Sequence, residues 1–401
     1  MFFAGWLSAV VVAAPLEVVP LDDARIVEVA ARADGKAVVL LGEMHYGAAV
    51  PGLVGDVLFA LHEREPVSLL VLERSYSWTP WLDGYVTETD DEVAAGIMAV
   101  IEPTTSQQST ALLARIRAHN LEHPDAVIRV GASDIEHDLV EAERRVFRPF
   151  LESLSEDYEG RSFASWEVYF EYLDGVLAEA APDAGVGQVR TPFVRRVLAN
   201  ARAGVAAYEG EEHDGWEAFS TLRQEAINRN LVGSEHLGPL AAGGRILVYG
   251  GSMHTRTGEG CLPRYEGCFL ANEHQPTRGS TLSIRVMYLS TDLTGWEGVD
   301  FEACVEARGT SAQYWGMVER FMTEYERRGW TLDRPRRFRT VARAIERYLT
   351  RDGPVDPLLV DGGTRNGWVR ETLWGHDVAV VIPHTPLSQP HCPDPGTPEP
   401  E

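Results

Sequence analysis

The chain has 401 residues, enough for one large domain or two ordinary ones, and its 44% hydrophobic content is normal for a protein with a buried core. It carries 60 acidic and 36 basic residues, so its formal net charge is −24 at pH 7. A chain this acidic repels nucleic acids and anionic membrane surfaces, so we expect no nucleic-acid partner.

The first twenty residues, MFFAGWLSAVVVAAPLEVVP, contain an apolar core from Phe2 to Val12, followed by the small residues Ala13 and Ala14. This pattern resembles a secretory signal, although the first basic residue is Arg25. We therefore expect export to a periplasmic or extracellular compartment; the alternative is an apolar arm on a cytoplasmic protein. The apolar run is too short to span a bilayer, and no later run is longer, so we expect no transmembrane segment.

Apolar strands alternate with amphipathic helical patterns along most of the chain, as in parallel α/β sheets. Strands are predicted over residues 36–43, 67–74, 126–136, 244–254, 281–290 and 374–385. Helices are predicted over residues 51–65 and 110–123, over four stretches between residues 142 and 234, and over residues 312–328. The predicted fold class is therefore α/β, with a mostly parallel central sheet flanked by helices.

The helical stretch from about residue 141 to residue 237 falls between the third and fourth core strands, and we expect it to form a helical insertion that caps the sheet. Because strand-like segments lie on both sides of it, residues 21–385 are predicted to form a single domain. Residues 386–401 are Pro-rich and predicted to be disordered. Cys261 and Cys268 lie seven residues apart in CLPRYEGC, and in an exported protein we expect them to close a small disulfide loop.

Ionisable side chains follow four of the predicted strands at the point where each strand ends. They are Glu43 and His45 after the first strand, Glu73 and Arg74 after the second, Asp134, Glu136 and His137 after the third, and His254 after the fourth. Taken singly, each has an ordinary structural explanation, such as a turn cap, a salt bridge or a surface histidine. The carboxyl ends of parallel strands meet at one edge, however, and charges gathered there are costly unless they pair or take part in chemistry. The sequence therefore predicts an active or binding site at this edge.

Two chemistries fit these residue types. In the first, His45 or His254 is a general base toward water, a carboxylate fixes its tautomer, and Arg74 stabilises the developing oxyanion. In the second, a divalent metal is bound by Glu43, His45, Glu73 and His254. Both chemistries require the same residue types, so the sequence leaves both open.

The order of five motifs resembles that of the erythromycin esterase-like hydrolases and of their wider relatives, the ChaN-like haem-uptake proteins, TraB and the Tiki proteases. The motifs are LLGEMHYG, LLVLERSYSWTPWLDGYV, RVGASDIE, LRQEAINRN and LVYGGSMH. These groups share a Gly-Glu-x-His type motif after one strand, a glutamate after the next and a distal histidine after a later one. The resemblance covers about residues 37–287 and extends to the last strand at residues 377–383.

The esterase resemblance implies that His45 activates water, that Glu43 and Glu73 support it, and that His254 lines the same pocket. This sequence departs from the esterases in having one residue, Met44, between the glutamate and the histidine where they have two. That spacing is closer to the ChaN and Tiki pattern. The distal segment GGSMH also differs from the Ala-His-Asn type lead of the esterases.

A helix motif of the esterases, Arg-x-x-x-Met-x-x-Asn, matches Arg223, Ile227 and Asn230. Their spacing places all three along one helical face, so Ile227 is expected to be a buried anchor while Arg223 and Asn230 point toward the sheet end. An ordinary amphipathic helix is the alternative. We expect the substrate to contact Arg223 and Asn230 together with the third-strand group, Asp134, Glu136 and His137.

The leading functional hypothesis is a hydrolase that cleaves an ester, lactone or amide of a small-molecule substrate, with no required cofactor. The first alternative is a binding protein for haem or a divalent metal without catalysis. The second is a metal-dependent peptidase of the Tiki type. The motif spacing and the predicted export signal keep these alternatives open.

Overall fold

The computed structural model describes residues 18–45, 47–154, 162–233, 244–258, 260–288, 358–361, 375–382 and 385. Its strands are β1 (Val18–Pro20), β2 (Val38–Glu43), β3 (Val67–Ser75), β4 (Arg129–Asp134), β5 (Gly185–Val186), β6 (Val189–Arg190), β7 (Arg245–Gly251), β8 (Thr281–Tyr288), β9 (Leu358–Asp361) and β10 (Val378–Ile382). Its α-helices are α1 (Asp23–Ala31), α2 (Ala49–Arg64), α3 (Thr79–Thr87), α4 (Asp91–Ile101), α5 (Gln107–Glu122), α6 (Leu139–Ala142), α7 (Arg148–Leu154), α8 (Trp166–Glu179), α9 (Thr191–Asp214), α10 (Trp216–Leu231) and α12 (Glu266–Cys268). The predicted helix at residues 312–328, the tail at residues 386–401 and most of the predicted signal segment lie outside the described residues.

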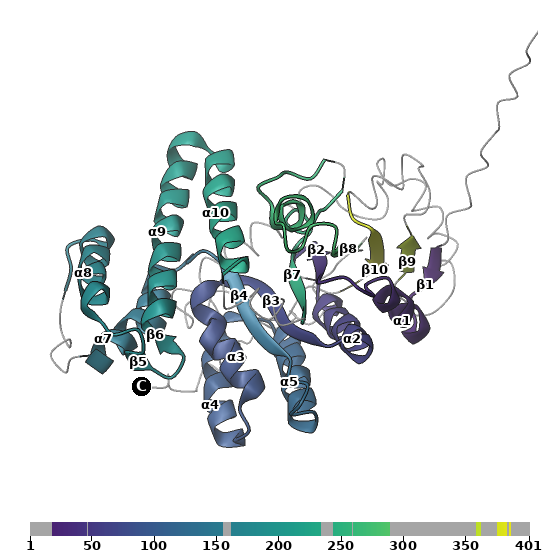
Figure 1. Ribbon diagram of the computed structural model, residues 1–401, viewed down its shortest axis with the longest axis horizontal. Coiled ribbons are helices and arrows are strands. Elements are labelled where there is room, and N and C mark those ends of the chain that lie inside the picture. The colour runs from purple at the N-terminus through teal and green to yellow at the C-terminus, as the bar shows by residue number, and fades with distance from the viewer. Residues whose placement is uncertain are drawn as a thin grey trace, which may run out of the picture.

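The described strands other than the β5–β6 hairpin form one sheet in the order β1-β9-β10-β8-β2-β7-β3-β4 (Figure 1). From β10 to β4 every neighbouring pair is parallel. Strand β9 pairs antiparallel with β10, and β1 pairs antiparallel with β9. The predicted α/β class with a mostly parallel sheet is confirmed.

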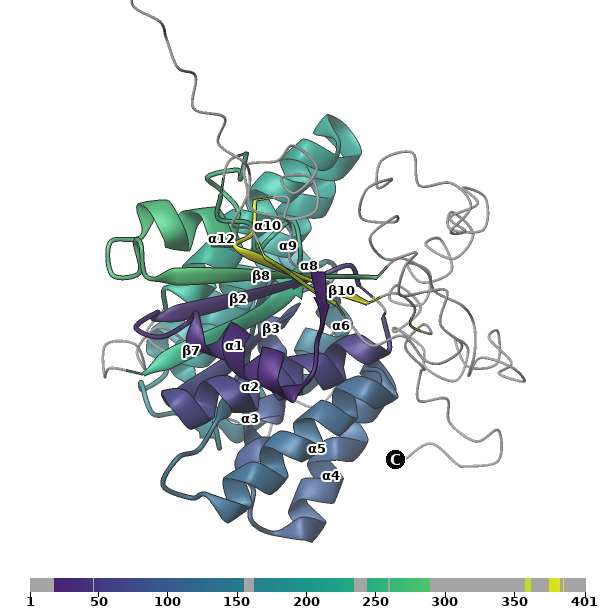
Figure 2. The same cartoon turned by 90° about the vertical axis from the view of Figure 1, so that its right-hand side faces the viewer.

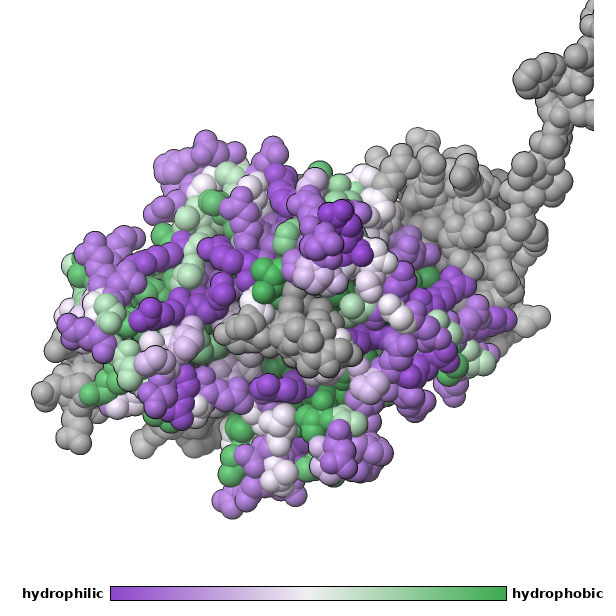
Figure 3. Space-filling model, viewed as in Figure 1, coloured by the Kyte–Doolittle hydropathy of each residue, from purple (hydrophilic) through white to green (hydrophobic). Residues whose placement is uncertain are grey.

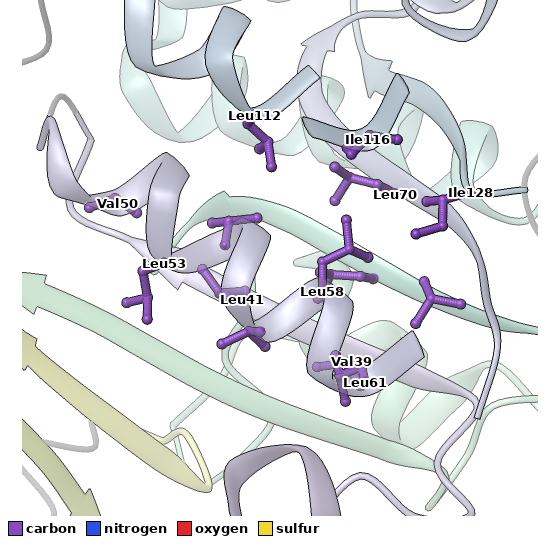
Figure 4. Close-up of a cluster of buried hydrophobic side chains, with 14 of the residues drawn as sticks. Val39, Leu41, Val50, Leu53, Leu58, Leu61, Leu70, Leu112, Ile116 and Ile128 are labelled. Carbon is purple, nitrogen blue, oxygen red and sulfur yellow. The ribbon is translucent and has the colours of Figure 1, made fainter. Parts of the chain in front are cut away.

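One face of the sheet packs against α2 and α5 (Figure 4). Successive residues of a strand point to opposite faces, so Val39 and Leu41 join the cluster on this side, with Leu58 and Leu61 of α2 and Ile116 of α5. All five side chains have no exposed surface. Each buried leucine contributes about 2 kcal/mol relative to an exposed one, so α2 is held mainly by its apolar stripe.

The opposite face packs against α10, so the sheet lies between two helical layers (Figure 2). Val38 and Leu40, which alternate with the residues of the first face, contact a cluster that contains Ile227 and Leu231 of α10. Ile227 has no exposed surface, which confirms the prediction that it is a buried anchor. Its burial fixes the rotation of α10, and therefore the direction in which Arg223, one turn earlier, extends.

Between β4 and β7 the chain forms helices α6 to α10, a π-helix at Glu143–Phe147 and the β5–β6 hairpin. Helices α6 to α9 and the π-helix share a second hydrophobic cluster, which includes Phe147, Leu173 and Val197 and which Tyr76, directly after β3, joins. Helix α10 packs along α9 and against β4. In Figure 1 α8 and α9 therefore stand beside the β4 edge rather than over the sheet.

Several elements were not predicted from the sequence. Helix α4 begins at a clear signal, because Asp90 accepts hydrogen bonds from the backbone N–H groups of Glu92 and Val93. Helix α3 contains Pro80 in its first turn, a position that a helix tolerates. The third and fourth predicted strands are shorter than expected: β4 ends at Asp134 and β7 at Gly251, so Glu136, His137 and His254 lie in the following loops.

Among the described residues, no helix combines the length and the apolar character that crossing a bilayer requires. The surface visible in Figure 3 is mainly hydrophilic, as the acidic composition leads one to expect.

We expect Leu58→Ala to lower the free energy of unfolding by about 3 kcal/mol, because it leaves a cavity between α2 and the sheet. Leu121→Ala is the matched control, since Leu121 is 43% exposed on α5, and its effect should stay within about 0.5 kcal/mol. Urea denaturation followed by circular dichroism measures both. Equal effects would contradict this assignment of the core.

Candidate active site

The ends of β2, β7, β3 and β4 lie side by side at one edge of the sheet. In the register of β2 with β7, Glu43 is level with Gly251, and in the register of β3 with β4, Ser75 is level with Asp134. The side chains that follow these four strands therefore meet at one place, which is the arrangement that the parallel pattern predicts.

Arg223 of α10 joins two of these strand ends. Its Nε donates hydrogen bonds to both carboxylate oxygens of Asp134, at 2.9 and 3.2 Å, and its second terminal nitrogen lies 2.6 Å from Asp134 Oδ2. The same terminal nitrogen donates to Glu73 Oε1 at 2.5 Å. The three side chains are 13%, 2% and 11% exposed for Arg223, Asp134 and Glu73, so solvent screens these charges only weakly.

The charges around this arginine hold both carboxylates ionised. Burial opposes the charge of Glu73, but the positive fields of His254, Arg223 and His45 outweigh it and lower its pKa to about 2. Burial likewise opposes the charge of Asp134, and Arg223 and His137 hold its pKa well below the usual range. In return, the two carboxylates raise the pKa of Arg223 further above its ordinary value despite its burial. The result is a buried network in which every charge has an opposite neighbour.

His254 is the second member of this network. Its Nε2 lies 3.3 Å from Glu73 Oε1 and 3.5 Å from a terminal nitrogen of Arg223. Its Nδ1 lies 3.2 Å from Glu266 Oε2 and 2.7 Å from the Gln224 amide. Burial lowers the pKa of His254, but the fields of Glu73 and Glu266 are stronger and raise it overall.

His45 lies beside this network and is 48% exposed. Its Nδ1 is 3.5 Å from Glu43 Oε1, and its backbone carbonyl accepts a hydrogen bond from the Tyr288 hydroxyl at 2.7 Å. Desolvation at the sheet end lowers the pKa of His45, but the hydrogen bond with Glu43 and the fields of Glu73 and Glu43 raise it to about 9. The structure thus brings the four predicted residues Glu43, His45, Glu73 and His254 to one edge.

Two glycines at the end of β7 make room for these side chains. A Cβ atom on Gly250 would lie 2.7 Å from Glu73 Oε2, and a Cβ atom on Gly251 would lie 2.8 Å from His45 Nε2 and 3.3 Å from His254 Cδ2. The N–H of Gly251 also donates to Glu73 Oε2, at 2.5 Å. His45 and His254 therefore converge over a bare backbone, which explains the paired glycines in LVYGGSMH.

Arg74 is placed differently from our expectation. Its guanidinium donates to the backbone oxygen and the hydroxyl of Thr104, at 3.1 and 2.8 Å, and lies 4.7 Å from the centre of the Trp78 ring. Glu73 and Arg74 are neighbours on one strand and so point to opposite faces. The positive charge that the structure supplies beside Glu73 is Arg223, not Arg74.

His137 and Glu136, which follow the third strand, form hydrogen bonds with different parts of the structure. His137 lies with Nε2 2.9 Å from Asp134 Oδ2 and with Nδ1 2.8 Å from the Tyr208 hydroxyl, so it belongs to the network. Glu136 is 1% exposed and accepts hydrogen bonds from the backbone N–H and the hydroxyl of Ser77, at 2.8 and 2.6 Å. Burial outweighs these bonds and raises the pKa of Glu136 to about 7.

Asn230 is 1% exposed and holds α10 in place. Its amide donates to the Ser133 carbonyl at 2.7 Å and exchanges hydrogen bonds with the Asn200 amide at 3.1 and 3.2 Å. It thus points toward the end of β4, as expected, but the groups it contacts are protein groups.

Gln224, Glu266 and Tyr208 contact the network and were not predicted. Gln224 follows Arg223 in LRQEAINRN, but the helical pattern there does not mark its contact with His254. Glu266 lies inside CLPRYEGC, where only the two cysteines carry a recognisable pattern. Tyr208 lies on helix α9 and contacts the network through His137. No local sequence pattern marks that contact.

A metal ion bound by Glu43, His45, Glu73 and His254 stays a prediction for the described part of the chain. No three His, Cys, Asp or Glu side chains there are grouped as ligands of a metal ion. The guanidinium of Arg223 also occupies the space between Glu73 and Asp134, and its positive charge opposes a cation at that point.

No family model and no curated protein matches the chain. A solved structure of a protein from Bacillus cereus matches with a TM-score of 0.56 at 14% identity, covering 93% of this chain and 100% of that one. A second, described as a succinoglycan biosynthesis protein, matches with a TM-score of 0.52 at 11% identity, covering 93% and 95%. The chain has the fold of these proteins.

A mutant of the erythromycin esterase EreC in its open conformation also matches, with a TM-score of 0.46 at 15% identity, covering 68% of this chain and 75% of that one. The two matches with TM-scores above 0.5 confirm the predicted α/β fold.

We expect Arg223→Met to lower the free energy of unfolding at neutral pH by about 3–5 kcal/mol, because it leaves two buried carboxylates without their cation. Arg202→Met is the matched control, since Arg202 and its partner Asp174 are 44% and 53% exposed, and it should cost less than about 1 kcal/mol.

Acid should affect the two proteins differently. The depressed pKa values of Glu73 and Asp134 stabilise the wild type above the unfolded pKa values of about 4, and this contribution is lost as the pH falls from there toward 2. Arg223→Met should lose less stability over this range. Parallel pH profiles for the two proteins, measured by urea denaturation, would contradict the electrostatic account.

Proposed function

We propose that the protein is a hydrolase that cleaves an ester, lactone or amide, with His45 as the general base toward water. The observation that carries this proposal is the position of His45: it is half exposed at the meeting point of four strand ends, with a carboxylate 3.5 Å from its Nδ1. The neighbouring His254 is 8% exposed and enclosed by Glu73, Gln224 and Glu266, so it is a supporting group.

The proposed reaction begins with neutral His45. Its imidazole removes a proton from water, the resulting hydroxide attacks the carbonyl carbon, and the carbonyl electron pair moves onto oxygen. The imidazolium then returns the proton to the leaving oxygen or nitrogen as the tetrahedral intermediate collapses. Glu43 fixes the ring orientation and stabilises the imidazolium.

Arg223 takes the role that the sequence had suggested for Arg74. Its Nε and one terminal nitrogen are used by Asp134 and Glu73, whereas among the described residues the other terminal nitrogen has only the 3.5 Å contact with His254. We propose that this nitrogen stabilises the developing oxyanion, where a preorganised donor is most effective. His137 and Asp134 hold the guanidinium from the other side.

Export remains part of the proposal. The structure joins Cys261 and Cys268 in a disulfide, as the sequence predicted for an exported chain. Structural disulfides are typical of oxidising compartments, which supports a periplasmic or extracellular location.

We expect the purified protein to hydrolyse at least one member of a panel of aryl esters, lactones and anilides. His45→Ala should lower kcat by about a hundredfold or more, because general-base catalysis typically contributes about 10²–10⁴. Glu73→Gln should also lower kcat, whereas His213→Ala, at an exposed histidine of α9, should not. Equal activity in wild type and His45→Ala would remove the proposal, and loss of activity in a chelator with recovery on adding a divalent metal would favour the metal-dependent alternative.

The pH profile should report the pKa of His45. Because the base must be neutral, and its pKa is raised to about 9, kcat/KM should increase from pH 7 toward pH 9. Glu43→Gln removes two of the causes that raise this pKa and should shift the acid limb down by about one pH unit. Steady-state kinetics on the most active ester measures both proteins. An acid limb at the same pH in both would show that Glu43 does not act on the base.

A further inference from the structure

The disulfide between Cys261 and Cys268 closes a short loop next to His254. The loop contains Tyr265, Glu266 and Gly267, and all three are buried. The Asn272 amide lies 3.5 Å from the sulfur of Cys268 and 3.8 Å from that of Cys261, so the bridge is packed against the following π-helix. A covalent ring of this size keeps its few residues in a narrow range of conformations.

Among the described residues, Glu266 is the only carboxylate in contact with Nδ1 of His254, the inner ring nitrogen, at 3.2 Å. It is 1% exposed. A carboxylate can only accept a hydrogen bond, so Nδ1 of His254 carries the proton. Nε2, on the other side of the ring, is thereby directed at Glu73 and Arg223.

Gln224 supports the same proton placement. Its amide group lies 2.7 Å from His254 Nδ1, and its Oε1 is buried with no partner among the described residues. The two ends of an amide are interchangeable by a half-turn, which places the oxygen at Nδ1, where it can accept a hydrogen bond. Glu266 and Gln224 then both accept from the one N–H of the His254 ring.

Residues of the loop contact both the backbone and the ring of His254. The N–H of Gly267 donates to the His254 carbonyl at 2.8 Å, and the Tyr265 ring lies edge-on at 5.3 Å from the His254 ring. The Tyr265 hydroxyl bonds to Ser220 of α10 at 2.8 Å. A Cβ atom on Gly267 would lie 2.5 Å from the Arg256 carbonyl oxygen, so the loop and the turn after β7 pack backbone to backbone.

We propose that Glu266 is a positioning residue for His254, and that the disulfide-closed loop Cys261–Cys268 is the element that keeps it in place. Among the described residues, Glu266 contacts His254 and not His45. It therefore acts through the ring of His254. With the loop closed, His254 presents Nε2 to Glu73, and Glu73 in turn contributes to the field on His45. Without Glu266, Nδ1 of His254 keeps only the contact with Gln224 and loses the charged partner that orients the ring toward Glu73.

The first test uses two substitutions of Glu266 in the full chain; this kinetic arm rests on the proposed hydrolase function. Glu266→Gln keeps the shape and an acceptor oxygen but removes the charge, and we expect kcat to fall about tenfold. Glu266→Leu removes the acceptor as well, and kcat should fall about a hundredfold. KM should change by less than about twofold in both, because Glu266 is buried behind His254 and does not meet substrate.

The control for this test is Glu273→Gln, at an exposed glutamate beyond the loop, which should leave kcat unchanged. Urea denaturation of all the variants separates positioning from folding. A fall in kcat for Glu266→Gln with an unchanged unfolding midpoint supports the proposal. Unchanged kcat in both Glu266 variants of an active enzyme overturns it and leaves the hydrolase proposal standing.

The second test needs no activity. In protein labelled with ¹⁵N in its histidine rings, the Nδ1–H of His254 should give a downfield signal near neutral pH, which is assigned by its absence in His254→Gln. Glu266→Gln should move this signal upfield, since a neutral acceptor makes a weaker hydrogen bond, and Glu266→Leu should move it further. If the wild type hydrolyses nothing, a moved signal still supports the positioning role, and an unmoved signal in both variants overturns it.

The disulfide itself is tested with a dithiol reductant. One thiolate attacks Sγ of Cys261, the less buried of the two cysteines, and Cys268 leaves as a thiolate. The second thiolate of the reductant then attacks the reductant sulfur that is bonded to Cys261, and Cys261 leaves as a thiolate. The two cysteines gain two electrons and two protons while the dithiol becomes a cyclic disulfide.

Reduction of the wild type should move the His254 signal in the same direction as Glu266→Gln and lower kcat in parallel. The double variant Cys261→Ser/Cys268→Ser should show the same changes without reductant, and adding reductant should change nothing more. An unmoved His254 signal in the reduced wild type and in the double variant would overturn the role of the disulfide.

Discussion

The bond between Arg223 and the two carboxylates of Glu73 and Asp134 is the interaction on which the rest of the site depends. Three charged side chains from three separate elements are nearly removed from water, and none of them is tolerable there alone. Because each charge is balanced, α10 is locked to the ends of β3 and β4. The apolar contacts of Ile227 place the helix, and the guanidinium then fixes which strand ends it serves.

The electrostatics of the two histidines follow from this arrangement. Glu73 remains ionised beside Arg223, and its negative charge acts on His254 and His45 together. His254 is enclosed and has polar partners at both ring nitrogens. In the proposed arrangement, the disulfide loop fixes the orientation of its ring and thereby its contact with Glu73. His45 keeps nearly half of its surface exposed, and it is the histidine that a substrate can reach. One network thus supplies a rigid interior and an accessible base.

Much of this could be predicted from the sequence. Buried strands that each end in an ionisable residue must bring those residues together if the strands are parallel, so the convergence of Glu43, Glu73, Asp134 and His254 required only the strand pattern. The helical spacing of Arg223 and Ile227 likewise indicated which side of α10 faces the sheet. The alternation of side chains along a strand would also have separated Glu73 from Arg74, had it been applied there.

The contacts of Glu266, Gln224 and Tyr208 could not be predicted, for a physical reason. Each depends on the path of a loop or on the packing of one helix against another, and neither leaves a periodic signal in the sequence. Glu266 is the clearest case, because an isolated glutamate between two cysteines has the same local pattern whether it faces solvent or a buried histidine. Only its 1% exposure and its place beside Nδ1 of His254 identify it.

The most direct test of the central claim is a double-mutant cycle on Arg223 and Asp134. The free energy of unfolding is measured by urea denaturation at neutral pH for wild type, Arg223→Met, Asp134→Asn and the double variant. If the two residues form one buried unit, each single change should cost several kcal/mol and the double change much less than their sum, with a coupling energy above about 1 kcal/mol. Additive costs, within about 0.5 kcal/mol, would contradict the account.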